Sequence, residues 1–162
     1  MTVTDYWKLF KPAVCSVDLC GATREELFAQ LVDNFVRAKY LAPQQHEAAV
    51  EALLEREARA STGVGQRVAI PHVKLAGLDE ALVSLSLHRA GVEWGAIDGQ
   101  PVSLFFTVLR PEKAGARHQP ERHLDMMRWI SQLGRDADFR RFAQAVTTKK
   151  ALVDLLRELS PS

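Results

Sequence analysis

Two helical patterns of hydrophobic residues mark the first half of the chain. Apolar residues recur at helical spacing over residues 27–36 and again over 44–59, with charged residues between them, so each segment is expected to bury one face. Thr23 with Glu26 predicts the start of the first helix, because these two side chains satisfy backbone amides that a helix leaves unpaired. Ala42-Pro43 separates the two patterns, which indicates a helical hairpin.

The middle of the chain carries strand patterns. After the glycine-punctuated residues 61–67, the apolar run Val68-Ala69-Ile70 is expected to form a strand that ends at Pro71, because proline cannot donate to a sheet ladder. Residues 82–88 alternate apolar side chains with Ser84, Ser86 and His88, as is typical of a half-buried strand. Residues 102–109 are apolar nearly throughout, which predicts a central strand buried on both faces.

The two ends of the chain complete the expected architecture. Residues 7–19 indicate an irregular start and a short strand, and residues 110–119 an exposed loop. Helices are expected over residues 120–134, 136–145 and 148–159, the first of them burying an apolar stripe. These elements predict an α/β fold, a sheet covered by helices on both faces and built as a single domain over residues 1–162. The stripe expected in the first of the three helices comprises Leu124, Met127, Ile130 and Leu133.

Composition excludes several classes of partner. Lys and Arg number 21 against 20 Asp and Glu, a formal charge of +1, which removes the usual basis for binding nucleic acid or anionic membrane. No apolar run is long enough to cross a bilayer and the first residues do not form a signal peptide, so we expect no membrane insertion and a cytoplasmic location. Cys15 and Cys20 lack a second pair for a zinc site and are expected to be reduced thiols.

His72 is the main candidate for chemistry, because it directly follows the strand and its proline. A neutral imidazole is a nucleophile near physiological pH and can carry a phosphoryl group on one ring nitrogen. His123 lies near a helix start, where unpaired amides favour an anion and disfavour an imidazolium. Arg56 and Lys74 are further candidates to support such a group.

Other interpretations of the same residues stay open. Arg56 is equally compatible with an exposed ion pair to Glu55 or Glu57. His72, His118 and His123 form a possible three-histidine zinc site, although no H-E-x-x-H spacing supports it. His72 at a strand end with no role is the structural alternative, whereas His46 and His88 read as surface groups. The chain has no phosphate-binding Gly-x-x-x-x-Gly-Lys-Ser/Thr loop, so an ATP-driven kinase is not expected, and no cofactor is called for.

Five motifs follow one another along nearly the whole chain: Leu54-Glu55-Arg56-Glu57, Ser61-Thr62-Gly63-Val64-Gly65, Val68-Ala69-Ile70-Pro71-His72, Asp98-Gly99-Gln100-Pro101-Val102 and His123-Leu124. In this order they resemble the type 2 (fructose/mannitol) enzyme IIA domain of the bacterial phosphoenolpyruvate-dependent phosphotransferase system, including its nitrogen-regulatory members. The resemblance implies a mixed β-sheet flanked by helices. It also implies that His72 is the phosphoryl acceptor, that His123 is the assisting histidine and that Arg56 lies near the site.

The resemblance also implies partners. The donor would be the phosphocarrier HPr or its nitrogen-branch relative, and a IIB domain or a regulated transporter or kinase would follow. The 162 residues show no IIB or IIC domain, which favours a regulatory role over sugar uptake. Val73 departs from the family, which usually has a small residue directly after the histidine. A non-phosphorylated module that regulates a transporter, kinase or transcription factor by binding is the alternative function.

Overall fold

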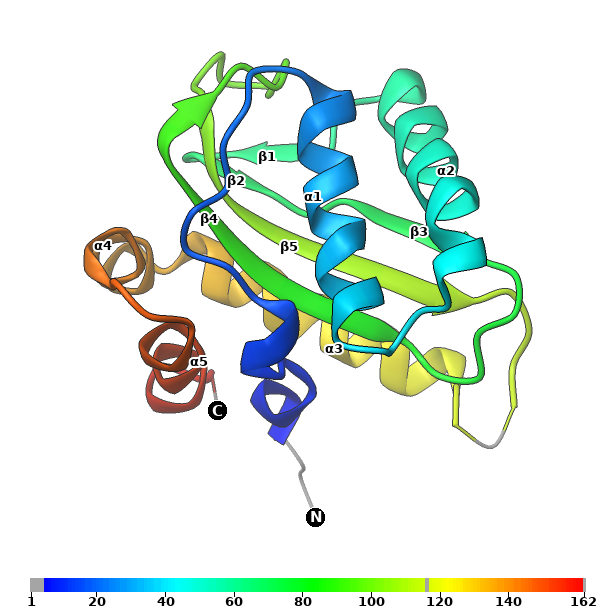
Figure 1. Cartoon of the computed structure of the whole chain (residues 1–162). Helices are drawn as coiled ribbons and strands as arrows, with labels where there is room; N and C mark the ends of the chain where they lie inside the picture. Colours follow the sequence, from blue (N-terminus) through cyan, green and yellow to red (C-terminus); the bar gives the residue numbers. More distant parts are fainter. Residues whose placement is uncertain (1–4, 116, 162) are drawn as a thin grey trace.

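The computed structural model describes residues 5–115 and 117–161. Within them the chain forms one mixed β-sheet with helices on both faces, the α/β architecture that the sequence predicts (Figure 1). The strands are β1 (Gly63–Gly65), β2 (Val68–Ala69), β3 (His72–Leu75), β4 (Leu82–Val92) and β5 (Val102–Pro111). The α-helices are α1 (Arg24–Arg37), α2 (His46–Arg59), α3 (Pro120–Arg135), α4 (Ala137–Ala145) and α5 (Lys149–Glu158), and short 3-10 helices are η1 (Asp5–Leu9), η2 (Pro12–Val14) and η3 (Pro43–Gln45).

β5 lies at the centre of the sheet, as its apolar sequence predicts. It pairs antiparallel with β4 and parallel with both β2 and β3. Val68 lies opposite Leu104 and His72 opposite Val108, so β2 and β3 follow one another along the same strand. β1 pairs antiparallel with β2 and continues the order β1-β2-β5-β3.

Different helices cover the two faces of the sheet. α1 and α2 pack together over one face, and α3 runs across the other (Figure 1). α4 and α5 follow α3 and lie near β4 and the first residues of the chain (Figure 1). The helical hairpin expected from Ala42-Pro43 is therefore confirmed as α1 and α2, joined through η3.

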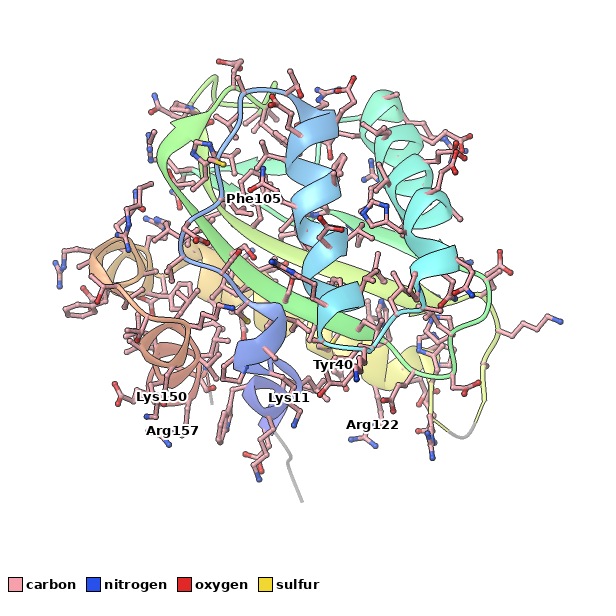
Figure 2. The ribbon with its side chains drawn as sticks, in the orientation of Figure 1. Lys11, Tyr40, Phe105, Arg122, Lys150 and Arg157 are labelled. Carbon is pink, nitrogen blue, oxygen red and sulfur yellow. The ribbon has the colours of Figure 1, made fainter. Side chains whose placement is uncertain are left out.

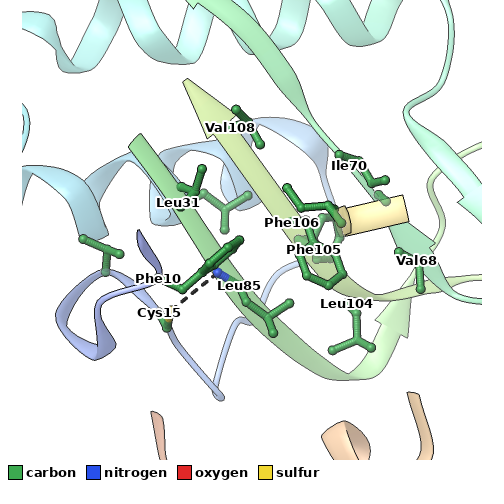
Figure 3. Packing of buried hydrophobic residues seen from close by; sticks show 14 of the residues in the cluster. Phe10, Cys15, Leu31, Val68, Ile70, Leu85, Leu104, Phe105, Phe106 and Val108 are labelled. Atoms are coloured by element: carbon green, nitrogen blue, oxygen red, sulfur yellow. Dashed lines mark hydrogen bonds between the residues drawn. The ribbon is translucent and has the colours of Figure 1, made fainter. Parts of the chain in front are cut away.

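Neighbouring phenylalanines of β5 pack into opposite layers. The Phe105 ring lies 4.9 Å from the ring of Trp94, which in turn contacts Phe28 of α1. The Phe106 ring lies 6.3 Å from Phe10 and 6.0 Å from Phe139, on the other side of the sheet. Figure 3 shows Phe10, Phe105 and Phe106 among the buried hydrophobic residues. Burial of β5 on both faces, expected from its sequence, is confirmed.

The start of α1 has the predicted capping geometry. The Glu26 amide donates to Thr23 Oγ1 at 3.1 Å, and the Glu26 carboxylate accepts from the Thr23 amide at 3.2 Å. Asp136 and Thr148 likewise accept from backbone amides at the starts of α4 and α5. Short polar side chains thus fix where these helices begin.

The expectation of a half-buried β4 is wrong, because its polar face is covered. Ser84 and Ser86 are fully buried and His88 is 6% exposed. The segment before α1 lies over them: Ser86 Oγ is hydrogen-bonded to Ser16 Oγ at 2.9 Å, and His88 Nε2 lies 3.0 Å from the Gly21 carbonyl oxygen. The alternating pattern predicted that Ser86 and His88 face solvent, but both bind the segment before α1.

Two further expectations need correction. The start of the chain forms η1 and η2, and its strand is reduced to a single bridge between Ser16 and Ser86. In α3, Ile130 and Leu133 are buried as predicted, but Leu124 is 52% exposed and Met127 only half-buried, because His123 and Met126 take the inward positions in the first half of the helix. Among the described residues, no helix has the length and apolar character needed to span a membrane. The residues that α3 buries are His123, Met126, Trp129, Ile130, Leu133 and Gly134.

Candidate functional site

Pro71 interrupts a strand where it was expected to end one. β2 and β3 both run parallel to β5, and Pro71 lies in the short gap between them. Its carbonyl oxygen accepts a hydrogen bond from the Val108 amide at 2.8 Å, so the ladder continues past a residue that has no N–H of its own. His72 is consequently the first residue of β3, and the strands before and after the proline both pair with β5.

The glycine-rich segment before His72 is held by a buried carboxylate. Glu57 of α2 is 2% exposed, and its two oxygens accept from the amide and the hydroxyl of Thr62, each at 2.6 Å. The Thr62 carbonyl oxygen then accepts from the Ile70 amide at 3.0 Å. This chain of contacts ties α2 to the strand that precedes His72.

A tight turn and a second carboxylate complete this segment. Gln66 and Arg67 join β1 to β2 with φ values of 56° and 68°, a left-handed turn whose twist suits an antiparallel hairpin. Asp98 Oδ2 accepts from the Gln66 amide at 2.7 Å. The Asp98-Gly99 motif therefore contacts the β1–β2 hairpin, so two loops that are far apart in the sequence lie side by side.

One ring nitrogen of His72 is committed to the backbone. Nδ1 lies 2.7 Å from the carbonyl oxygen of Ile70. A carbonyl oxygen only accepts, so Nδ1 carries the proton in this contact, and in the neutral ring Nε2 keeps the free lone pair. The half-buried His72 side chain thus presents a defined nucleophilic nitrogen.

His123 is brought to the same face of the sheet. His72 pairs with Val108, and Val108 lies on the same face of β5 as Phe106, two residues earlier. Phe106 packs against Phe10, which contacts Trp129 of α3, so this is the face that α3 covers. His123, in the first turn of α3, is 9% exposed, and burial lowers its pKa to about 4. The charges of Arg110, His118 and His72 lower this pKa further. The lowered pKa favours a neutral imidazole at this position, with burial as its main cause.

His118 is buried, contrary to the exposed loop expected for residues 110–119. It is 5% exposed, and its ring meets the His123 ring edge to face with centroids 5.3 Å apart. Backbone hydrogen bonds between Gly115 and His118 fold the loop back on itself, and this turn brings the His118 ring under α3. Burial, and then the charge of Arg110, lower the pKa of His118 as well.

Arg110 is a site residue that the sequence analysis missed. It lies on β5 opposite Lys74, two residues beyond Val108, and so shares the face that carries His72. Its Nε atom is buried without a hydrogen-bond partner among the described residues, and no carboxylate there pairs with it. One sequence signal could have identified Arg110 as a site residue. It stands at the end of the apolar run 102–109, where a charged side chain is unusual.

Arg56 lies in the last turn of α2, and α2 packs against β3. Its Nη1 donates to the Ala60 carbonyl oxygen at 2.8 Å, which caps the end of the helix. Within the described residues it forms no ion pair with Glu55 or Glu57, and Glu57 is engaged with Thr62. The simple surface ion pair is therefore not what the structure shows.

Val73, directly after His72, has ordinary strand geometry. It pairs with Leu109 in the ladder between β3 and β5. The non-glycine residues with positive φ in the described parts of the chain are Lys39, Gln66 and Arg67. A β-branched side chain at position 73 is therefore unstrained.

The three-histidine zinc alternative finds no geometric support. In residues 5–115 and 117–161, no three His, Cys, Asp or Glu side chains converge closely enough to hold a metal ion. His72, His118 and His123 are neighbours, yet their nitrogens do not meet at one point. What surrounds His72 is instead a set of cations and neutral rings, which suits an anion.

Comparisons with known proteins agree with this fold. The family described as phosphoenolpyruvate-dependent sugar phosphotransferase system, EIIA 2, matches residues 8–159. A fructose-specific EIIA component from Haloferax volcanii is 31% identical over 159 residues, which cover 98% of this chain and 99% of that protein. Nitrogen regulatory protein IIA-Ntr from Neisseria meningitidis has a TM-score of 0.77 at 29% identity, covering 93% of this chain and 97% of that one. Enzyme IIA for mannitol from Escherichia coli, solved in complex with phosphorylated enzyme IIB, shares the fold with a TM-score of 0.68 at 17% identity over 92% and 97% of the two chains.

The match spans nearly all of the chain, so the chain belongs to the EIIA type 2 family of the phosphoenolpyruvate-dependent sugar phosphotransferase system. The family resemblance and the mixed-sheet fold expected from the sequence are both confirmed. The relatives include a sugar-specific and a nitrogen-regulatory protein, so family membership is compatible with either role.

Proposed function

We propose that this protein is a phosphoryl carrier in which Nε2 of His72 accepts a phosphoryl group from a phosphorylated HPr-like protein and passes it on. The observation that carries the proposal is the 2.7 Å contact between His72 Nδ1 and the Ile70 carbonyl oxygen. It orients the ring and leaves the other nitrogen as the nucleophile, which is the arrangement that transfer between two histidines requires. Membership in the EIIA type 2 family supports the same role.

The transfer step balances without a cofactor. The Nε2 lone pair of His72 forms the new N–P bond while the N–P bond of the donor histidine breaks, and the donor nitrogen keeps that electron pair. The His72 ring then carries a positive charge, because Nδ1 keeps the proton that it donates to the Ile70 carbonyl oxygen. The Ile70 carbonyl stabilises that proton, which keeps the ring a good leaving group for the next transfer.

Nearby groups would compensate the charge of the phosphoryl group. Arg110 offers a guanidinium that no carboxylate in the described chain neutralises. The unpaired amides at the start of α3 favour an anion, and a neutral His123 can donate a hydrogen bond without competing for the proton. Arg56, on the helix that packs against β3, and the exposed Lys74 would add to this support. His123 and Arg56 are therefore proposed as supporting groups, with His72 as the acceptor.

The names of the relatives suggest the partners. A mannitol enzyme IIA forms a complex with phosphorylated enzyme IIB, so we propose a IIB domain, or a transporter or kinase regulated in its place, as the recipient. We propose a regulatory role ahead of sugar uptake on the likeness to the nitrogen regulatory protein of Neisseria meningitidis, while the likeness to a fructose-specific EIIA component keeps sugar uptake as the alternative. No nucleic acid is expected as a partner, given the formal charge of +1.

Incubation with phosphoenolpyruvate, enzyme I and HPr, or the nitrogen-branch pair, tests the carrier function. We expect an acid-labile mass gain of one phosphoryl group that is lost in His72→Ala and kept in His46→Gln, a histidine on α2 that is paired with Asp33. Wild-type protein that gains no mass with either donor pair would contradict the proposal. The protein would then be better described as an interaction module, and pull-downs with wild type and His72→Glu would give the same partners.

A further inference from the structure

A cavity of about 340 Å³ lies on the side of His123 that faces the start of the chain. It is enclosed by η1, the end of α1, the start of β4 and the first turn of α3. Tyr40 is 45% exposed and Leu9 46% exposed, and both side chains line this cavity. Its volume is within the range of small-molecule sites, which run from about 300 to 1,000 Å³. The apolar and aromatic part of the wall includes Tyr6, Leu9, Val14, Phe35, Tyr40, Leu82, Val83 and Met126.

The polar part of the wall is predominantly basic. Lys11, Arg117 and Arg122 line the cavity, and none of them forms an ion pair within the part of the chain that the structure describes. Figure 2 shows Lys11, Tyr40 and Arg122 along one side of the molecule. Of the two acidic residues in the wall, Asp5 is bound to Lys8 at 3.1 Å, which leaves Glu80 to oppose three cations. The cavity therefore favours an anion over a cation.

Two buried imidazoles line the same cavity. Both are at least nine-tenths buried, since His118 is 5% exposed and His123 is 9% exposed. His118 Nε2 and His123 Nδ1 have no hydrogen-bond partner among the described residues. Buried polar atoms in proteins usually have partners, so these two nitrogens in one wall are available to a molecule or a water that enters the cavity.

We propose that this cavity binds a small organic carboxylate with an aromatic or branched apolar body. The apolar body would contact Tyr6, Tyr40 and Met126, while the carboxylate would meet Arg122 and its basic neighbours. A neutral ligand would leave the cations unpaired, and a long peptide would not fit within the volume. Because His123 lines both this cavity and the site of His72, the bound carboxylate would also alter phosphoryl transfer, a consequence that rests on the proposed function.

Binding can be tested without phosphorylation. Phenylacetate and 3-methylbutanoate serve as probes in an NMR titration of amide resonances, with phenylacetamide as the uncharged match and acetate as the match without an apolar body. We expect saturable shifts around the cavity for the two probes, and about tenfold weaker binding for phenylacetamide, since a charge-assisted contact is lost. Acetate alone should give no saturable shift. If neither probe shows saturable shifts at the cavity, or if phenylacetamide binds as well as phenylacetate, the site is not a carboxylate site.

Arg122→Gln and Arg128→Gln form a matched pair of variants on α3. Arg122 lines the cavity, whereas Arg128 is exposed and bound to Asp125 at 3.1 Å. We expect Arg122→Gln to weaken probe binding about tenfold and Arg128→Gln to leave it unchanged. Equal effects of the two substitutions would show that only general surface charge attracts the probe, which overturns the proposal.

The link to phosphorylation is measured separately, as the rate of His72 labelling with and without saturating phenylacetate. A changed rate in wild type and an unchanged rate in Arg122→Gln would support the coupling. If wild type is never labelled, the carrier function fails while the binding result stands. If labelling occurs at the same rate with the cavity filled, the coupling through His123 is wrong.

Discussion

The Glu57 carboxylate holds both the amide and the hydroxyl of Thr62, at 2.6 Å each, although it is 2% exposed. A buried carboxylate survives only where its oxygens are satisfied, and these two bonds join the end of α2 to the glycine-rich segment before His72. The pair therefore sets the distance between the helix that carries Arg56 and the strand that carries His72.

Removing this carboxylate should loosen the site and weaken the fold. Glu57→Ala leaves the Thr62 amide buried without an acceptor, so we expect the free energy of unfolding to fall by about 3 kcal/mol. Urea denaturation measures the loss, and hydrogen exchange should show faster exchange at the Thr62 amide. Glu55→Gln, an exposed position on the same helix, is the control and should change stability little. If Glu57→Ala has a free energy of unfolding close to that of wild type, the glycine-rich segment 61–67 keeps its structure without the Glu57 carboxylate.

Arg110 should matter for phosphoryl transfer although it lies on a strand that reads as core. In Arg110→Gln the His123 ring loses a nearby positive charge, so the pKa of His123 should rise while burial keeps it below its ordinary value. NMR titration of the histidine ring protons follows this shift. We also expect labelling of His72 to slow about tenfold, because one charge-assisted contact to the phosphoryl group is lost.

Lys113→Gln, an exposed change in the same region, is the matched control for Arg110→Gln. It removes the same charge without touching the histidines. Should both variants shift the pKa of His123 equally, the effect comes from net charge and not from the position of Arg110.

Stability should depend on pH through His123. The unfolded chain binds a proton on this histidine near pH 6.5, whereas the folded state resists it until about pH 4. Between these values the unfolded state binds more protons, so the stabilisation is complete above about pH 6.5 and is lost as the pH falls toward about 4. The loss attributable to His123 is at most about 3 kcal/mol. His123→Gln should flatten this part of the profile in denaturation experiments, and an unchanged slope would contradict the lowered pKa.

The features that the sequence predicted correctly are those that local chemistry determines. The capping contacts of Thr23 and Glu26 involve only residues within one helical turn, and a strand as apolar as β5 must be covered on both faces. Two of the family motifs, the glycine-rich segment before His72 and Asp98-Gly99, likewise lie in turns that adopt positive φ values. These signals lie within a few neighbouring residues, so they could be read without the fold.

The errors came from contacts between distant segments. Ser86 reads as an exposed strand residue, but it is buried because Ser16, seventy positions earlier, supplies its partner. His118 reads as a loop residue, but its ring packs against His123 once the loop folds back under α3. In α3, burial of Ile130 and Leu133 was predicted correctly, whereas Leu124 and Met127 were misplaced because Met126 and Trp129 are buried instead, and Trp129 packs against Tyr6 and Phe10. Periodicity in one segment carries no information about such partners.

Val73 should stabilise the strand without hindering phosphorylation. The family resemblance leads one to expect a small residue after the histidine, yet Val73 pairs with Leu109 at a normal strand position, so no glycine conformation is needed. We expect Val73→Gly to lower the free energy of unfolding by about 1 kcal/mol, because glycine gains backbone freedom in the unfolded chain and loses the packing of the side chain. The labelling rate of His72 should stay within about twofold of wild type, whereas one charge-assisted contact is worth about tenfold. Val73→Thr keeps the branched shape and is the control for stability. Labelling that becomes about tenfold faster in Val73→Gly would instead show that the valine holds the donor protein away from His72.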